Sequence, residues 1–163
     1  MKKVVTFILA FSVLAVNAQE KAKSQKVKKP KTMKTTSGLE YTITEKGSGK
    51  KPQTGDKVIV HYTGKLTNDT VFDSSVKRGE PFTFKLGAGQ VIKGWDEAFQ
   101  LLQVGDKATI KFGPELGYGA QEMGKIPANS TLIFDVELVD VIEGIRAWDV
   151  KGKDTVKTAS GLK

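Results

Sequence analysis

The sequence predicts an α+β domain in which a strongly curved antiparallel β-sheet wraps around one short α-helix. Two observations support this fold class. From residue 37 onward, short segments rich in β-branched and aromatic residues alternate with loops of glycine, proline and polar residues. Only residues 95–102 show the spacing of an amphipathic helix. Because one short helix cannot cover a whole sheet face, we expect a ligand to enter where that face is left uncovered.

Six segments are the candidate strands of this sheet. Turn-forming sequences such as "TNDT" (67–70) and the polar loop "VKRGE" (76–80) separate them, and a long loop is expected over residues 114–130. The clearest alternation occurs in the last segment, which is expected to present Leu132, Phe134, Val136 and Leu138 on one face. The predicted strands are 39–47, 57–66, 71–75, 81–86, 106–113 and 131–142.

The predicted helix, "WDEAFQLL" (95–102), carries acidic residues near its start, where they complement the helix dipole, and Gly105 follows its end. Its apolar face is expected to consist of Trp95, Ala98, Leu101 and Leu102.

Trp95 stands directly behind Gly94, at the start of this helix. A leucine could serve for core packing here, and for Trp95 taken alone, core packing is the alternative explanation. We expect Trp95 to form the floor of a pocket, with Gly94 allowing the backbone to approach closely.

The first residues have the pattern of a secretory signal peptide. Two lysines precede an apolar run, and Val16-Asn17-Ala18 provides small side chains at the usual cleavage positions. We expect cleavage after Ala18 and an exported protein, periplasmic in a bacterium with two membranes or otherwise secreted. The alternative is an uncleaved membrane anchor, although the apolar run is short for a span of about 20 residues. After cleavage, no stable membrane insertion is expected.

The basic charge of the chain lies mainly outside the predicted domain. Residues 19–36 contain seven lysines and one glutamate, whereas residues 37–163 contain equal numbers of basic and acidic side chains. Residues 19–36 also lack the large apolar residues that a core needs, so we expect a basic, flexible linker. A docking segment for acidic lipid or polymer is the alternative. No nucleic-acid partner is expected, because the domain itself has no excess of positive charge.

Several classes of catalytic site are excluded by composition. The chain has no cysteine and one histidine, His61. Thiol catalysis, disulfides and multi-histidine metal sites are therefore ruled out. We expect no cofactor and no metal.

The domain signal ends at Ile142, and residues 143–163 are expected to form a polar C-terminal tail. The sequence "VKTASGLK" (156–163) is similar to "MKTTSGLE" (33–40), where the predicted domain begins. We interpret this similarity as the remnant or start of a tandem copy. Chance similarity between two polar segments is the alternative. The expected organisation is a signal peptide over 1–18, a linker over 19–36, a domain over 37–142 and a tail over 143–163.

Six motifs occur in order: "VHYTGKL", "FDSS", "PFTFKLGAGQVIKGWDEA", "VGDKA", "LGYGA" and "KIPANSTLIFDVEL". In this order and spacing, the chain from about Leu39 to Val141 resembles the FKBP-type peptidyl-prolyl cis-trans isomerases, and most closely their exported bacterial members. The resemblance implies acceleration of X-Pro bond rotation in exported, folding proteins. It implies proline-containing segments as substrates and FK/rapamycin-type macrolides as inhibitors. A binding module or chaperone that holds such segments with little turnover is the alternative function.

The resemblance also implies which side chains form the site, in an aromatic pocket that stabilises the twisted amide without a covalent step. The catalytic set would be Tyr62, Phe72, Asp73, Trp95, Tyr118 and Phe134. The substrate- and inhibitor-binding set would be Arg78, Phe82, Val91, Ile92 and Ile126. The Ile92 N–H and the Tyr118 hydroxyl would donate to substrate carbonyls. Asp73 would orient the pocket or interact with the twisted carbonyl, and the alternative is a surface ion pair with Arg78.

Four local features depart from the common family pattern. Phe112-Gly113 precedes the Pro-Glu pair where a proline is frequent, Gly117 replaces a common alanine, and the loop around Met123 is short. "TNDT" also lacks the glycine often found in that turn. These positions are expected at the rim of the pocket, where they would affect substrate preference more than activity.

His61 precedes Tyr62 in a predicted strand, and neighbouring strand residues point to opposite faces. If Tyr62 faces the pocket, His61 faces away from it. Phe84 and Phe112 are expected to be core residues rather than pocket residues.

Overall fold

The structure, a computed structural model, describes residues 30–145 of the 163-residue chain. The predicted signal peptide, most of the predicted linker and the repeat-like segment 156–163 lie outside the described residues. The elements, in chain order, are β1 (Thr32–Lys34), β2 (Glu40–Glu45), β3 (Lys57–Leu66), β4 (Val71–Ser74), α1 (Ser75–Arg78), β5 (Phe82–Lys85), α2 (Lys93–Leu101), β6 (Lys107–Phe112), the 3-10 turn η1 (Pro114–Leu116) and β7 (Leu132–Ile142).

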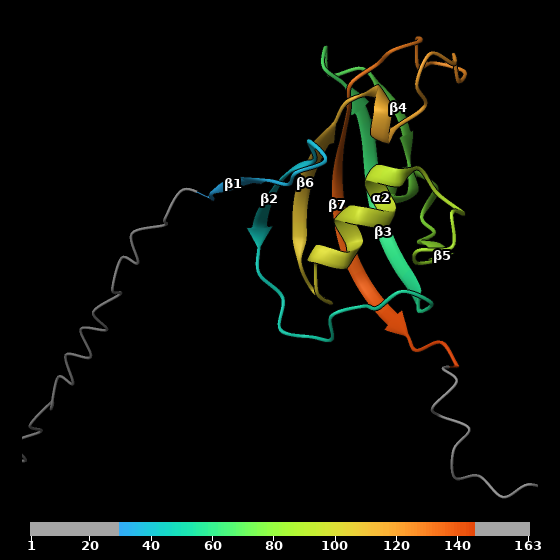
Figure 1. Cartoon of the computed structure of the whole chain (residues 1–163). Coiled ribbons are helices and arrows are strands. Elements are labelled where there is room, and N and C mark those ends of the chain that lie inside the picture. The colour runs from blue at the N-terminus through green and yellow to red at the C-terminus, as the bar shows by residue number, and fades with distance from the viewer. Residues whose placement is uncertain (1–29, 146–163) are drawn as a thin grey trace, which may run out of the picture.

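The seven strands form one antiparallel sheet in the order β1-β2-β6-β7-β3-β4, with β5 paired to the first half of β3. Its centre is the long pair β3 and β7, and the pairing register shifts within β3 between Ile59 and Val60. Such a shift bends a strand. In Figure 1 the sheet curves around α2, which lies across one face of β3 and β7. The predicted fold class is therefore confirmed.

The core lies between α2 and the inner face of the sheet. Val58, Val60 and Tyr62 alternate into it from β3. The predicted inner face of β7 is confirmed, because all four of its residues are buried: Leu132, Phe134, Val136 and Leu138. Phe84 and Phe112 are also buried, at 3% and 1% exposure, which confirms that they are core residues.

The buried face of α2 differs from the predicted one at one position. Trp95, Ala98 and Leu102 are buried as expected, but Leu101 is only partly buried and Phe99 takes the place assigned to it. Successive helical residues turn by about 100°, so Phe99 lies close above Trp95 and Leu101 points well to the side. The buried face of α2 therefore contains two aromatic side chains, Trp95 and Phe99, where the sequence predicted one.

Gly94 has a packing role that was not predicted. A Cβ placed there would lie 2.7 Å from three atoms of the Phe112 ring. The missing side chain therefore allows the start of α2 to approach β6 in the core. This glycine serves helix packing. Its expected role in bringing the backbone close to a ligand remains a prediction.

Three short elements were not predicted. β1 lies within the expected linker 19–36 and pairs with β2 through Met33 and Tyr41, so ordered structure begins before residue 37. α1 replaces part of the expected loop 76–80. The Ser74 side chain accepts from the Lys77 N–H at its start, and Gly79 closes it in the left-handed conformation. η1 is a single 3-10 turn inside the expected loop 114–130. Elements this short do not contain enough residues to show a repeating pattern of apolar side chains in the sequence.

No helix among residues 30–145 is long and apolar enough to cross a bilayer.

Asp106 is a fully buried carboxylate that holds the turn after α2. It accepts hydrogen bonds from the Gly47 N–H at 2.7 Å, from the Gln103 N–H at 2.9 Å and from Lys46 Nζ at 3.1 Å. These contacts tie the loop after β2 to the loop before β6.

Asp106→Ala is expected to lower the free energy of unfolding by about 3 kcal/mol, because it leaves two partly buried N–H groups without an acceptor. Urea unfolding followed by far-UV circular dichroism measures the change. A matched Asp135→Ala replacement removes a half-exposed carboxylate paired with Lys65, and we expect it to cost less than about 1 kcal/mol. Equal losses for the two variants would contradict the structural role of Asp106.

Candidate active site

The uncovered part of the sheet face holds a cavity of about 710 Å³. Its walls come from β3, β4, β5, the segment leading into α2, the long loop after η1, and β7. Its lining residues are Tyr62, Phe72, Asp73, Phe82, Gln90, Val91, Ile92, Trp95, Tyr118, Met123, Gly124, Lys125, Ile126 and Phe134. Five of these are aromatic rings other than Tyr118, so the interior of the cavity is mostly apolar.

Trp95 lies at the base of this cavity with only 5% of its surface exposed. Its ring centre lies 4.9 Å from that of Tyr62 and 5.3 Å from that of Phe134, each in an edge-to-face arrangement. The indole N–H is buried and has no hydrogen-bond partner in the described part of the chain. Trp95 is therefore both a core residue and a wall of the cavity.

Phe72 and Phe82 form more exposed parts of the wall. Phe72 is partly buried, and its ring packs edge-to-face against Phe134 with centres 5.6 Å apart. Phe82 is 38% exposed and lies 6.2 Å from the Tyr62 ring. These two rings border the entrance, whereas Trp95 and Phe134 lie beneath.

Asp73, Arg78 and Tyr62 form a polar group at one side of the cavity. The Tyr62 hydroxyl donates to the Asp73 carboxylate, Arg78 pairs with the same carboxylate, and Arg78 Nη2 donates to the Tyr62 hydroxyl at 3.0 Å. Burial raises the pKa of Asp73, but hydrogen bonds from Tyr62, Arg78 and the Ser74 N–H outweigh it and hold that pKa below its usual value. Burial, and then the hydrogen bond to Asp73, raises the pKa of the Tyr62 phenol. Asp73 is therefore charged and Tyr62 neutral near neutral pH.

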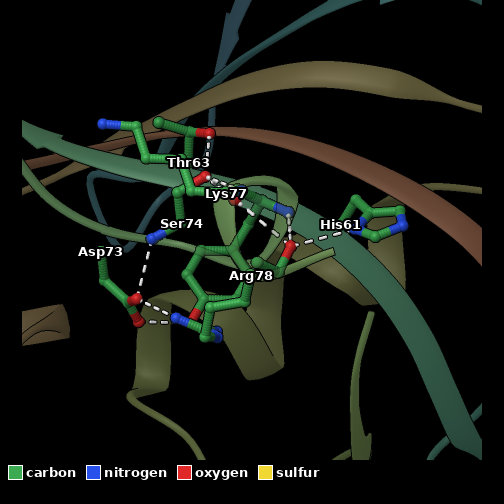
Figure 2. A network of polar contacts seen from close by, with 8 residues as sticks. His61, Thr63, Asp73, Ser74, Lys77 and Arg78 are labelled. Atoms are coloured by element: carbon green, nitrogen blue, oxygen red, sulfur yellow. Dashed lines mark hydrogen bonds and ion pairs between the residues drawn. The ribbon is translucent and has the colours of Figure 1, made fainter. Parts of the chain in front are cut away.

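A second set of contacts fixes Tyr62 from behind. The buried Ser75 hydroxyl accepts from the Tyr62 N–H at 2.8 Å and lies 3.1 Å from His61 Nδ1. Figure 2 shows the two ends of this network, with Asp73 and Arg78 paired on one side and His61 on the other. His61 does not line the cavity, so the prediction that it faces away is confirmed.

The opposite rim carries hydrogen-bond donors. Ile92 is the N-cap residue of α2, and no side chain caps this helix. The first N–H groups of a helix have no partner within it. Tyr118 is partly buried, and its hydroxyl bonds to no other described residue. Burial, and then the Asp73 charge, raises the pKa of the Tyr118 phenol, so this hydroxyl stays protonated at neutral pH.

The structure brings together ten of the eleven predicted site residues around one cavity. Arg78, the eleventh, does not line the cavity but pairs with Asp73 and donates to the Tyr62 hydroxyl, and both of these residues line it. Gln90, Gly124 and Lys125 also line the cavity but were not predicted. Each is next to, or one residue removed from, a predicted lining residue. Their place in the sequence beside predicted site residues was the one feature that could have identified them.

The described residues contain no group of three or more metal-ligating side chains.

Comparison with known proteins identifies this architecture. Residues 48–139 match the model of the family described as FKBP-type peptidyl-prolyl cis-trans isomerase. The chain belongs to this family. It is therefore an FKBP-type isomerase, an enzyme that rotates the peptide bond preceding proline.

Individual relatives agree with this assignment. The chain is 55% identical over 103 residues to FK506-binding protein 1 of Dictyostelium discoideum, covering 63% of this chain and 96% of that protein. It is 56% identical over 115 residues to a probable FKBP-type peptidyl-prolyl cis-trans isomerase of Haemophilus influenzae, covering 69% and 47%. The crystal structure of FkpA from Escherichia coli has a TM-score of 0.65 and 41% identity, covering 71% and 53%. This chain thus spans about half the length of its bacterial relatives.

Proposed function

We propose that the FKBP-type domain of this chain accelerates X-Pro rotation in exported, folding proteins, and that the aromatic cavity is where rotation occurs. The observation that carries this proposal is the cavity around Trp95, in which apolar rings and a few oriented polar groups meet. Peptide-bond rotation costs about 18–20 kcal/mol, because the twisted amide loses its resonance. A catalyst therefore has to bind the twisted amide better than the planar one.

A twisted amide is less dipolar than a planar one, so a dry aromatic cavity favours it relative to water. In the proposed mechanism the proline ring rests on the Trp95 indole, and Tyr62, Phe72, Phe82 and Phe134 exclude water around it. No bond to the protein forms or breaks. Val91 and Ile126, two aliphatic side chains that also line the cavity, would complete this apolar enclosure.

The polar groups would hold the peptide in place. The Ile92 N–H and the Tyr118 hydroxyl would donate to carbonyls on either side of the rotating bond. Asp73 would keep the Tyr62 hydroxyl and the Arg78 guanidinium oriented along one wall, with its negative charge directed toward the twisted amide. The hydrogen bonds that Asp73 accepts support this orienting role.

The catalysed rate is expected to be independent of pH between about 5 and 9. Asp73 has a lowered pKa, so its contribution is present throughout this range and is lost only as the pH falls through that lowered value. The raised pKa values of Tyr62 and Tyr118 keep both hydroxyls protonated over the same range. The ratio of catalysed to uncatalysed rate for a Leu-Pro peptide measures this, and a bell-shaped profile would instead indicate proton transfer.

The first experiment is a peptide isomerisation assay at micromolar protein, repeated with a rapamycin-type macrolide. We expect acceleration of a Leu-Pro peptide and its loss when the macrolide is added. Trp95 fluorescence should change on macrolide binding, measured in a Trp148→Phe background to remove the second indole. A protein that is folded but produces no acceleration would contradict the proposal.

We further propose that the protein is exported, and that it consists of a signal peptide over 1–18, a basic linker, the isomerase domain and a polar tail. The apolar run followed by small residues at 16–18 supports this, as does the similarity to bacterial relatives such as FkpA of Aeromonas hydrophila. N-terminal sequencing of the protein purified from the periplasm or medium tests it. A chain that retains Met1 would contradict cleavage after Ala18.

A second function, holding of folding proteins, is favoured by the exposed apolar residues at the rim. Met123 is 47% exposed and Phe82 is 38% exposed, and both line the cavity. Aggregation of an unfolded client with and without protein measures holding. If protection persists in a Phe72→Ala variant that has lost isomerase activity, holding does not depend on rotation in the cavity.

A further inference from the structure

Among the described residues that line the cavity, Lys125 is the one basic side chain and Asp73 is the one acidic side chain. The two side chains differ in whether an opposite charge lies next to them. Asp73 accepts from Tyr62 and pairs with Arg78. The ion pairs of residues 30–145 involve other basic side chains and leave Lys125 without a carboxylate partner. The charge of Asp73 is thus largely offset, whereas that of Lys125 is not.

The backbone holds Lys125 at the tip of a tight turn. Met123 and Ile126 bond to each other in both directions, with N–H to O distances of 2.9 and 3.0 Å. Gly124 occupies the first central position with φ of 59°, as a two-residue hairpin with a primed turn requires. Ile126 is buried in the cavity wall, with 5% exposure. The backbone position of Lys125 is therefore fixed by this turn, directly next to a residue of the cavity wall.

We propose that Lys125 is a specificity-determining residue that favours substrates with an acidic side chain next to the proline. This inference rests on the proposed function of the cavity. A proline ring at Trp95 brings its flanking residues to the rim, where the exposed Lys125 ammonium has no competing partner in the described structure. A glutamate or aspartate of the substrate supplies the missing carboxylate. Glu122, although close in sequence, forms no ion pair with Lys125.

The size of the effect follows from exposure. An exposed ion pair changes binding by roughly two- to fivefold. The effect should shrink as salt approaches 1 M, where charges are screened beyond about 3 Å. The lysine stem also covers apolar surface. A test therefore has to remove the charge while keeping the length of the side chain, which methionine does.

The test compares kcat/KM for peptides that differ only in glutamate versus glutamine, placed directly before the proline in one pair and directly after it in another. For at least one pair, the Glu-to-Gln ratio is expected to be about two- to fivefold higher in the unmodified protein than in Lys125→Met. Lys125→Glu should reverse the preference. Lys51→Met removes another exposed lysine, one that does not line the cavity, and it should leave both ratios unchanged.

A Leu-Pro peptide separates this inference from the proposed function. If that peptide is accelerated equally by all variants but both Glu-to-Gln ratios are unaffected by Lys125→Met, the specificity role is overturned while the isomerase function stands. If the Leu-Pro peptide is not accelerated by the unmodified protein, the proposed function fails. Thermal unfolding of each variant checks that the exposed turn tolerates the change.

Discussion

Phe72→Ala is expected to lower kcat/KM for a Leu-Pro peptide by about 10- to 100-fold, the equivalent of losing the burial of one aromatic side chain. Phe72 forms one wall of the cavity and packs against a single other ring, that of Phe134. Its removal admits water to the place where the twisted amide would lie. Because Phe72 is only partly buried, the loss of unfolding free energy is expected to remain near 1–2 kcal/mol, below the range for fully buried rings.

The matched control for this prediction is Tyr41→Ala. Tyr41 is also partly buried against the core, but it lies on β2 and does not line the cavity. Its replacement should reduce stability by a similar amount and leave kcat/KM nearly unchanged. Equal losses of activity in both variants would show that Phe72 acts through stability alone.

Trp95→Ala is expected to cause the largest loss of stability of any cavity variant, about 3–5 kcal/mol. The indole is 5% exposed and contacts the rings of Tyr62, Phe82, Phe84, Phe99 and Phe134. Removing it opens a void that neighbouring rings cannot fill without leaving their own positions. Since domains of this size are stable by about 5–15 kcal/mol, the variant has little stability in reserve. Chemical denaturation measures the loss.

Activity at this position is better tested with Trp95→Phe. Phenylalanine preserves an apolar ring in the core, so the fold should survive, but it offers a narrower surface to the proline ring. We expect kcat/KM to fall about 10-fold, or roughly 1.4 kcal/mol. A Trp95→Phe variant with full activity would place the reacting amide elsewhere in the cavity.

The parts of the fold that depend on a repeating pattern could be predicted from sequence. Alternation along 131–142 correctly assigned Phe134 to the inner face, and a helical period located α2. The error at Leu101 arose because a residue six positions after Trp95 does not share its face, whereas Phe99, four positions after it, does. On this short helix, burial therefore depended on the position of each residue around the helix as well as on its apolar character.

Elements formed by caps and long-range pairing could not be predicted. α1 depends on the Ser74 cap and on Gly79, and β1 depends on backbone pairing with β2. The cavity wall shows the same limit. Gly124 and Lys125 reach the rim because the loop after η1 is folded back, with the Asn129 N–H bonded to the Gly119 carbonyl at 2.8 Å. No local pattern in a polar loop indicates this return.

We expect the cavity to favour the twisted amide and not simply to bind proline. NMR exchange measurements on a Leu-Pro peptide at saturating protein give the interconversion rate of the bound peptide separately from its dissociation constant. We expect Phe72→Ala to slow interconversion of the bound peptide about 10-fold or more and to weaken binding by a smaller factor. Weaker binding with an unchanged rate on the protein would contradict it.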